Sequence, residues 1–473
     1  MTKYIISPTP GGGSPAFPPA GGINAMAYCH GDGVTDDRAH ILAAIADAGA
    51  NPVYFLAGTY LLSSALTVPD GTDLVGPPVS ALAYPVSGCE VPTAHLSGAL
   101  IYGSDSTFSD LRIGASTVNG VLNGATAHDT TFTRCQFRGG GSSGWPHTAP
   151  MYFGGGTNDA TNITFSDCNI ERNLCDYATA ESNGANNVIW SEQVGNLSGS
   201  HMEYIYFLGC HFGVSNGRVG LTRNYGSPRM NVELYCDPSP DPNTGVRHGW
   251  HHVWFTDCCV EAGDMTCFNA PNAIYNNTHD DSYLYLEHST FYGGGYAQGT
   301  WPFGIAIEGA NYVTVDDCDI YPSYSFSFSF LATLGVDCNN AVITNNRFHC
   351  DDYSHMPFTT GDNQPTILLE GTSHTFTNNV LHSNPSGTGR AIQLWLGYFY
   401  DTGYGANMTI TGNEFHELRT DALVNSMVFV YNCTGTTITG NTFRNDRAGV
   451  PEITYAGTNT ATTVIDGTNN TLA

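Results

Sequence analysis

The hydrophobic and polar positions of this chain follow one short pattern that recurs eleven times. Each copy reads apolar, any residue, apolar, two small or polar residues, Cys or Asn, any residue, and Phe or Ile, as in Ile163–Ile170 and Met408–Phe415. Alternation with a period of two predicts a short strand with one buried face. The Cys/Asn position, here called the pivot, is occupied by Leu111, Cys135, Cys168, Cys210, Cys258, Ser289, Cys318, Asn346, Asn379, Asn413 and Asn441.

The spacing of the pivots predicts the architecture. Successive pivots lie about 24 to 48 residues apart, which is the range of solenoid repeats. One half-buried strand cannot cover its own apolar face, whereas stacked coils close a continuous core. Helical periodicity is nearly absent, and Gly and Asn are abundant, as turn-rich coils require. We expect an all-β fold, a single-stranded right-handed parallel β-helix, and a β-propeller or β-sandwich is the less favoured alternative. Phe165, Phe255 and Val315 should then line one core.

One α-helix is predicted near the N-terminus. The phrase Gly31–Asp37 runs into a stretch that ends at Gly49. Thr35 suits the N-cap, the adjacent Asp pair suits the positive end of the helix, and Gly49 suits the C-terminal stop. We expect a helix over about residues 36–48 that covers an otherwise open sheet edge. The Asp pair is therefore interpreted as structural and not as catalytic.

The chain divides into two parts by composition. Residues 1–25 are rich in Pro and Gly and lack a hydrophobic pattern, which predicts an extended arm. Residues 26–473 carry the repeats and are expected to form one β-helix domain. No export signal and no apolar stretch of membrane-spanning length is recognised, so we expect neither membrane insertion nor export by the ordinary route.

Charge and cysteine content narrow the partners. A formal net charge of −27 disfavours nucleic acid and anionic membranes as partners. Many of the 14 cysteines occupy pivots and none forms a Cys-x-x-Cys motif. We therefore favour free thiols stacked in the wall over disulfides.

Outward aromatic residues mark one candidate binding surface. Four residues before the pivot most coils carry Thr, but three consecutive coils carry aromatic residues there. Such rings have flat apolar faces and polar tips that suit sugar rings, although the same column could simply stiffen the sheet. The longest insertions flank these coils, and one of them is enriched in Arg. The residues assigned to substrate binding are Tyr206, Trp254, Tyr285, Tyr292, Arg247 and His248.

Carboxylates in one column suggest hydrolysis. Glu171 and Glu261 both lie three residues after a pivot, and the coil between them carries Gly213. Equivalent backbone atoms two coils apart are separated by about 9.6 Å. Inverting glycosidases place their acid and base carboxyl groups about 6.5–9.5 Å apart. We hypothesise that Glu171 and Glu261 form an acid/base pair, with Asp264 and Glu203 as substitutes. The alternative is a set of ordinary carboxylates on a solvated strand.

Two sets of residues are weaker metal candidates. His349, His382 and His416 lie on adjacent coils, where imidazoles about 5 Å apart could bind a transition metal, but no fourth ligand follows at a suitable spacing. We expect no cofactor, except that a lyase mechanism would call for Ca²⁺. Because Lys3 is the single lysine, a lyase would also need an Arg base, and hydrolysis is favoured. Aspartates directly before the pivot could bind Ca²⁺ but also suit turns: Asp110, Asp167, Asp257 and Asp317.

Residues 31–77 resemble the opening of pectate-lyase-superfamily β-helix proteins, including many bacteriophage tailspikes. In that family a GDGVTDD-like phrase leads into a capping helix and a YFPAGTY-like strand follows; here Leu56 replaces the usual proline. The resemblance implies a homotrimeric phage tail spike or minor tail protein that binds, and could cleave, a host-surface polysaccharide. Its arm would attach to other virion tail proteins. The repeats run nearly to Ala473, so trimerisation would have to use the faces of the coils.

Two other functions remain open from the sequence. One is a free, secreted bacterial polysaccharide lyase or glycoside hydrolase. The other is a structural or adhesive tail component without enzymatic activity.

Overall fold

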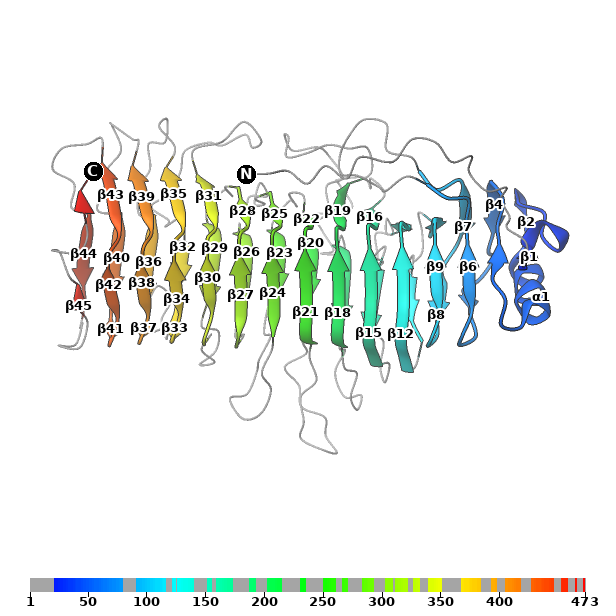
Figure 1. The fold of residues 1–473 in the computed structure, drawn as a ribbon, viewed down its shortest axis with the longest axis horizontal. Helices are drawn as coiled ribbons and strands as arrows, with labels where there is room; N and C mark the ends of the chain where they lie inside the picture. The colour runs from blue at the N-terminus through cyan, green and yellow to red at the C-terminus, as the bar shows by residue number, and fades with distance from the viewer. Residues whose placement is uncertain are drawn as a thin grey trace, which may run out of the picture.

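The recurring strands stack into one parallel coil, in which each strand pairs with the equivalent strand of the next repeat. Phe132 pairs with Phe165, Phe165 with Phe207, and Phe207 with Phe255, so the register follows the pivots. Figure 1 shows the strands side by side along the long axis of the molecule. The predicted right-handed parallel β-helix is confirmed.

The structure is a computed structural model. It describes residues 21–79, 91–115, 121–124, 126–139, 151–154, 159–172, 187–192, 202–214, 230–234, 250–260, 266–270, 283–292, 303–308, 311–321, 326–331, 339–350, 367–383, 393–397, 405–417, 427–445, 452–457, 464–465 and 471–472.

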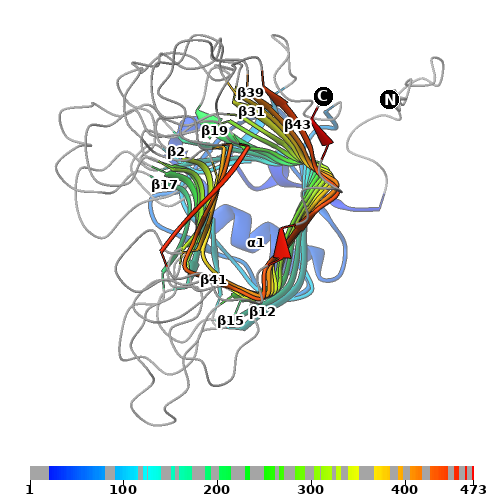
Figure 2. The ribbon, with the colours of Figure 1, turned by 90° about the vertical axis from the view of Figure 1, so that its left-hand side faces the viewer.

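Three long sheets form the walls of the coil, and a short fourth sheet lies in the C-terminal half. Seen along the axis in Figure 2, the long sheets surround a common interior. The strands of sheet A are β1 (Ile23–Asn24), β3 (Val53–Tyr54), β6 (Asp73–Val75), β9 (Thr107–Ser109), β12 (Thr126–Thr133), β15 (Asp159–Ser166), β18 (Met202–Leu208), β21 (Trp250–Thr256), β24 (Leu284–Glu287), β27 (Val313–Asp316), β30 (Val342–Thr344), β34 (Thr375–Thr377), β38 (Thr409–Thr411), β42 (Thr437–Thr439) and β45 (Val464–Ile465).

Sheet B follows sheet A in each coil, directly after the pivot. Its strands are β2 (Asp32–Asp36), β4 (Gly58–Leu61), β7 (Ala94–Ser97), β10 (Leu111–Ile113), β13 (Gln136–Gly139), β16 (Asn169–Arg172), β19 (His211–Val214), β22 (Cys259–Val260), β25 (Thr290–Phe291), β28 (Asp319–Ile320), β31 (Arg347–Cys350), β35 (Val380–Ser383), β39 (Glu414–Glu417), β43 (Thr442–Asn445) and β46 (Thr471–Leu472).

Sheet C forms the third wall of the coil, and sheet D is a separate sheet of three short strands. The strands of sheet C are β5 (Leu66–Thr67), β8 (Leu100–Tyr102), β11 (Val121–Asn123), β14 (Met151–Gly154), β17 (Asn187–Glu192), β20 (Met230–Leu234), β23 (Thr266–Ala270), β26 (Phe303–Glu308), β29 (Phe326–Leu331), β32 (Ile367–Leu369), β36 (Leu394–Gly397), β40 (Val428–Tyr431) and β44 (Ile453–Ala456). Those of sheet D are β33 (Gly371–Thr372), β37 (Gly405–Ala406) and β41 (Cys433–Thr434).

The inward residues of sheet A form a continuous apolar stack. Ring centroids are 4.7 Å apart between Phe108 and Phe132, 4.9 Å between Phe132 and Phe165, 5.0 Å between Phe165 and Phe207, and 4.7 Å between Phe207 and Phe255. Stacked aromatic pairs add about 0.5–1.5 kcal/mol each to the energy of burial. The same buried cluster, which confirms the predicted common core, continues through Leu286, Val315, Ile343, Phe376, Ile410 and Ile438.

The corner between sheets A and B turns through one left-handed residue immediately before each pivot. φ is 55° at Asp110, 52° at Asp167 and 55° at Asp257, a region that Asp and Asn enter at lower cost than most residues. The predicted turn role of these aspartates is confirmed. The pivots that follow these corner residues point inward and are buried.

The N-terminal end of the coil is covered by α1 (Arg38–Ala48), preceded by the short 3₁₀ helix η1 (Ala25–Ala27). Ile41, Ala44, Ile45 and Ala48 face the core from α1, and Figure 2 shows the helix lying across the end of the coil. The expectation that Thr35 caps this helix is wrong. Thr35 lies in β2, and the N-cap position belongs to the buried Asp37.

The buried pivots form a column of two chemical kinds. In the central coils the thiol of each Cys approaches backbone carbonyls, as Cys210 Sγ does at 3.4 Å from the oxygen of Phe165. In the C-terminal coils the pivots are amides that bond to one another: Nδ2 of Asn346 donates to Oδ1 of Asn379 at 3.0 Å, and Nδ2 of Asn379 donates to Oδ1 of Asn413 at 3.1 Å. The described pivot cysteines are all free thiols, as predicted: Cys135, Cys168, Cys210, Cys258 and Cys318.

Candidate functional site

Three predicted binding residues lie side by side on the outer surface of sheet A. Tyr206 in β18 pairs with Trp254 in β21, which pairs with Tyr285 in β24. Their ring centroids are 4.7 Å apart at both steps, with interplanar angles of 13° and 5°. Thr164 and Thr314 occupy the same position on the flanking coils. The sequence thus located a column of stacked rings that spans three coils.

A second aromatic column, which was not predicted, runs beside the first. It lies six residues before the pivot and consists of Tyr204, His252, Tyr283 and Tyr312. The ring centroids are separated by 4.8, 4.4 and 5.0 Å along this series, and every pair is stacked. We call the two columns together the aromatic face; it consists of Tyr204, Tyr206, His252, Trp254, Tyr283, Tyr285 and Tyr312.

The backbone of the second column is unusual for aromatic residues. φ is 56° at Tyr204, 52° at His252 and 56° at Tyr312, in the left-handed region. A residue with a Cβ atom there costs roughly 1–2 kcal/mol, and bulky residues are rare. In the flanking coils the same position carries small polar residues with a similar φ, as at Asn162 and Asn340. Aromatic side chains are therefore present where the fold alone favours Asn or Asp.

The stacked arrangement determines which parts of the rings can meet a ligand. Inside each column the ring faces cover one another, so the rings between the ends can offer only their edges to a ligand. At the ends of the second column, Tyr204 and Tyr312 each have a ring neighbour on one side and a coil bearing Asn on the other. Both are 38% exposed, more than the rings between them. The end rings therefore supply flat surfaces, and the intervening rings supply a row of polar edges.

Charged and titratable groups border the aromatic face. Glu203 in β18 pairs with His251 in β21, and these two residues directly precede Tyr204 and His252 of the second column. Partial burial lowers the pKa of His252, although the nearby Glu203 acts in the opposite direction. Partial burial, with a smaller contribution from Glu287, raises the pKa of Tyr285. Both shifts favour the neutral forms of His252 and Tyr285 at neutral pH.

Tyr292 lies on a different surface. It follows β25 in sheet B, where its ring stacks on Tyr321 at 4.8 Å, and Tyr321 stacks on His349 at 4.4 Å. Nε2 of His349 lies 2.7 Å from Oδ1 of Asp319, and hydrogen bonding with His349 lowers the pKa of this aspartate. The structure thus separates Tyr292 from the other three predicted aromatic residues, by the corner between sheets A and B.

The predicted catalytic carboxylates are only partly within the described residues. The backbone of Glu171 in β16 pairs with Gly213 in β19, the predicted empty rung. Glu261 and Asp264, and the predicted binding residues Arg247 and His248, lie outside the described residues. Glu203 is half-buried at the edge of the aromatic face.

The predicted histidine run is adjacent in space but does not form a three-ligand cluster. His349 pairs with His382, and His382 pairs with His416. Nε2 of His349 is engaged by Asp319, and the rings of His382 and His416 meet edge to face with centroids 5.3 Å apart. Within the described part of the chain, the groups of three metal-ligating atoms are found elsewhere: His30, Asp37 and His40, and Asp105, His128 and Asp129.

Two protein families match this chain. Residues 24–256 match the family described as "Rhamnogalacturonase A/epimerase, pectate lyase-like", and residues 254–400 match "Right handed beta helix region". No curated protein sequence matches. Among the described helices, none is long and apolar enough to cross a membrane.

Solved structures of related shape include a viral tailspike and bacterial enzymes. Bacteriophage CBA120 tailspike protein 3 has a TM-score of 0.55 at 11% identity, covering 95% of this chain and 61% of the tailspike chain. This chain therefore spans less than two thirds of that protein. The A-modules of two Azotobacter vinelandii mannuronan C-5 epimerases are also similar. That of AlgE6 has a TM-score of 0.45 at 14% identity, covering 95% and 98% of the two chains; that of AlgE4 has 0.49 at 15%, covering 94% and 100%. At these identities the likeness concerns the fold alone.

Proposed function

Because this chain is a right-handed β-helix protein of the pectate-lyase-like kind, we propose that it is a phage tail protein whose aromatic face binds a polysaccharide of the host surface. The tailspike among the structures of similar fold supports this choice. A β-helix offers such a ligand a long flat wall, on which equivalent positions repeat about every 4.8 Å.

One observation carries the proposal more than any other. Tyr204, His252 and Tyr312 occupy left-handed backbone positions that the neighbouring coils fill with Asn. Residues held at such a cost concentrate at binding and catalytic sites, and the inference runs from the observed strain to the function. A ladder that only stiffened the sheet would not need aromatic residues at these corners, because the first column already stacks.

The expected mode of binding follows from the exposed parts of the rings. Sugar rings would pack on the outer faces of Tyr204 and Tyr312 at the two ends. Their hydroxyl groups would hydrogen-bond to the polar edges between, which include the indole N–H of Trp254. The described groups at this face are neutral or acidic, so a neutral or amino-sugar polymer fits better than a strongly anionic one.

The test compares two tryptophans in different sheets. Trp254→Ala should weaken binding to a panel of purified bacterial capsular and O-antigen polysaccharides by at least about tenfold, as expected for a central aromatic contact. Trp395→Ala is the matched control, because Trp395 is a half-buried tryptophan of sheet C that also meets an aromatic neighbour, Phe429, at 4.4 Å. Equal affinity of the two variants for every polysaccharide that the wild type binds would refute the proposal.

We also propose that the bound glycan is cleaved by hydrolysis, with Glu171 and Glu261 as the acid/base pair and Asp264 or Glu203 as substitutes. The pairing of Glu171 with Gly213 supports the spacing of two rungs that this requires. Glu171→Gln and Glu261→Gln should each abolish sugar release and leave binding intact. Full activity in either variant would eliminate this pair, and binding without any release by the wild type would favour an adhesive tail component.

The virion context is part of the same proposal. We expect a homotrimer attached to other tail proteins by the predicted arm of residues 1–25, with the remaining chain forming one domain. The end of this arm already belongs to the coil, because Ile23–Asn24 form β1 of sheet A. Sedimentation of the purified protein and its presence in purified virions would distinguish a tail component from a free secreted lyase or hydrolase.

A further inference from the structure

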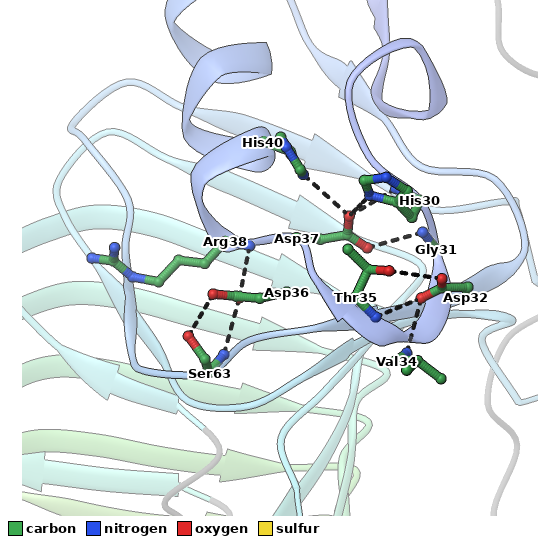
Figure 3. A network of polar contacts seen from close by, with 10 residues as sticks. All are labelled: His30, Gly31, Asp32, Val34, Thr35, Asp36, Asp37, Arg38, His40 and Ser63. Carbon is green, nitrogen blue, oxygen red and sulfur yellow. Dashed lines mark hydrogen bonds and ion pairs between the residues drawn. The ribbon is translucent and has the colours of Figure 1, made fainter.

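Three metal-ligating side chains converge at the N-terminal end of the coil, far from the aromatic face. His30 lies in the loop before β2, Asp37 at the N-cap position of α1, and His40 in the first turn of that helix. Figure 3 shows both imidazoles directed at the carboxylate of Asp37. One ligand atom from each residue lies within 4.8 Å of the other two.

The two separations from Asp37 Oδ1 are close to those around a small tetrahedral ion. Nδ1 of His30 is 3.2 Å from Oδ1 of Asp37, and Nδ1 of His40 is 3.6 Å from the same oxygen. A tetrahedral ion with bonds of about 2.0–2.1 Å holds its ligand atoms about 3.3 Å apart. The contact of His40 is too long for a hydrogen bond, and that of His30 is at the long end.

A second observation points to a missing partner. Nδ1 of His40 is buried and has no hydrogen-bond partner, although the rest of its side chain is 43% exposed. A buried nitrogen of this kind costs free energy unless something binds it. It is directed at the fully buried carboxylate of Asp37.

The buried carboxylate of Asp37 also needs a positively charged partner. Among the described residues its ion-pair partners are only His30 and His40, and the neighbouring Arg38 instead donates from Nε to the carbonyl oxygen of Ala65 at 2.9 Å. A buried carboxylate without a permanent cation is unfavourable. A divalent ion would supply that positive charge.

The carboxylate is also held in a fixed position. Its Oδ1 accepts the backbone N–H of His30 at 2.7 Å, and its Oδ2 accepts that of Gly31 at 2.9 Å. Such outer hydrogen bonds orient a ligand and raise metal affinity. The neighbouring aspartates are engaged otherwise: Asp32 accepts hydrogen bonds from Val34 and Thr35, which lower its pKa to about 2, and Asp36 accepts them from Ser63 and Arg38. Figure 3 shows these separate networks.

We propose that His30 Nδ1, His40 Nδ1 and Asp37 Oδ1 bind one Zn²⁺ or a similar divalent transition-metal ion. Two imidazoles and a carboxylate are ligands that suit Zn²⁺, and water would complete the tetrahedron on the exposed side. The ion would join the loop before β2 to the first turn of α1. Because the three ligands come together only in the folded chain, binding would stabilise the cap of the coil.

The test uses the full chain after removal of metal with a chelator. Titration with Zn²⁺ should show one high-affinity ion per chain, and Co²⁺ in its place should give the intense visible absorption of a tetrahedral site. In the double variant His30→Ala/His40→Ala the affinity for this Zn²⁺ ion should fall at least about tenfold, and the Co²⁺ absorption band should vanish. Both side chains are about half-exposed, so the fold should be retained, and circular dichroism checks this.

The matched control is His128→Ala, which removes a histidine from the other three-residue group. His128 is exposed, and Nδ1 of its ring lies within hydrogen-bonding distance, 3.1 Å, of Asp129. This variant should bind Zn²⁺ as the wild type does. Absence of a one-to-one event in the wild type, or an equal event in the double variant, would overturn the proposal. If the double variant does not fold, the single variant His40→Asn, which should lose the Co²⁺ band, decides in its place.

Discussion

The coils that carry the aromatic face and the coils that follow them have the same backbone arrangement. They differ in their buried pivot residues and in the outward residues of sheet A. From β18 to β27 the pivots are Cys, apart from Ser289, and the outer surface of sheet A carries the aromatic face, which ends at Tyr312 just before β27. From β30 to β42 the pivots are Asn, and the outward position four before the pivot carries Val342 and then Thr375, Thr409 and Thr437. The strand pairing and the left-handed corner continue unchanged through both regions.

The difference teaches how the repeat separates stability from binding. In the C-terminal coils each amide joins two coils: the backbone N–H of Asn379 donates to Oδ1 of Asn413 at 2.9 Å, and Nδ2 of Asn413 donates to Oδ1 of Asn441 at 2.9 Å. A thiol is a weak donor and acceptor and cannot form such a chain. The central coils have weaker hydrogen bonds in their wall and strained aromatic residues on their surface, which suits a region that serves a ligand.

The largest effect is expected from removing one amide. Asn413→Ala should lower the free energy of unfolding by about 3 kcal/mol or more. It removes the acceptor of the backbone N–H and Nδ2 of Asn379 and the donor to the carbonyl oxygen of Phe376, at about 1–3 kcal/mol for each buried group. Cys210→Ala is the matched control and should cost about 1 kcal/mol, for a small cavity and a weak hydrogen bond. Denaturant unfolding of both variants measures this. Equal losses would show that the two kinds of pivot are energetically alike.

The next effect is a pH dependence confined to the C-terminal coils. His374 is fully buried; its Nδ1 accepts the backbone N–H of Ala341 at 3.2 Å, and its Nε2 donates to the carbonyl oxygen of Glu370 at 2.9 Å. Burial lowers the pKa of His374 to about 4. The unfolded chain, with a pKa near 6.5, binds more protons between pH 6.5 and 4, so stability present above pH 6.5 is lost as the pH falls through this window.

The expected loss from His374 is about 3 kcal/mol in total, at about 1.4 kcal/mol per pH unit of pKa difference. Unfolding free energies of the wild type and of His374→Asn, measured from pH 7 to pH 4, should converge as the pH falls. The counterpart on the aromatic face is His252, which is only partly buried and should contribute much less; His252→Asn is the control. Parallel curves for the wild type and His374→Asn would exclude a neutral buried His374.

The same contrast explains which parts of the molecule could be predicted. The alternating pattern predicted the strands, their register and the outward direction of Tyr206 and Trp254, because each repeat places its strand in the same way relative to its pivot. It did not give the column of Tyr204 and His252, because a left-handed residue interrupts the alternation and re-aims the side chain. The signal was nevertheless present: the position six before the pivot changes from Asn or Asp to aromatic in four successive coils.

Two other features depended on interactions that a pattern does not contain. Thr35 and Asp37 are both good N-cap residues, and the choice is made by the loop at His30 and Gly31, whose backbone N–H groups bind Asp37. Tyr292 belongs to a column that resembles the first one in sequence. It faces elsewhere because the pivot corner intervenes. Glu261 and Asp264 lie outside the described residues, so the spacing of two coils that the register predicts between Glu171 and Glu261 stays a prediction.

A smaller effect is expected from exchanging the corner residues of the two regions. Asn407 has φ of 53° in a C-terminal coil, and Asn407→Tyr should cost about 1–2 kcal/mol because no aromatic neighbour compensates the strain. Tyr204→Asn relieves the same strain but loses the stack on His252, so its stability should change by less than about 1 kcal/mol while glycan binding falls. Thermal unfolding and polysaccharide binding of both variants test this. A marked destabilisation by Tyr204→Asn would show that the aromatic face serves mainly the fold.

The smallest effect is expected from replacing a thiol pivot with a hydroxyl. Ser289 is the one hydroxyl among the pivots, and it shows which hydrogen bonds a hydroxyl can form at this position. Its Oγ accepts the backbone N–H of Cys258 at 2.9 Å and donates to the carbonyl oxygen of Glu287 at 2.7 Å. Cys210→Ser should therefore change the free energy of unfolding by less than about 1 kcal/mol, because the hydroxyl offers the N–H of Cys168 a better acceptor than sulfur and offsets the lost volume. Denaturant unfolding beside Cys210→Ala measures it. If Cys210→Ser were as damaging as Asn413→Ala, the size of the pivot and not its hydrogen bonds would decide the stability of the corner.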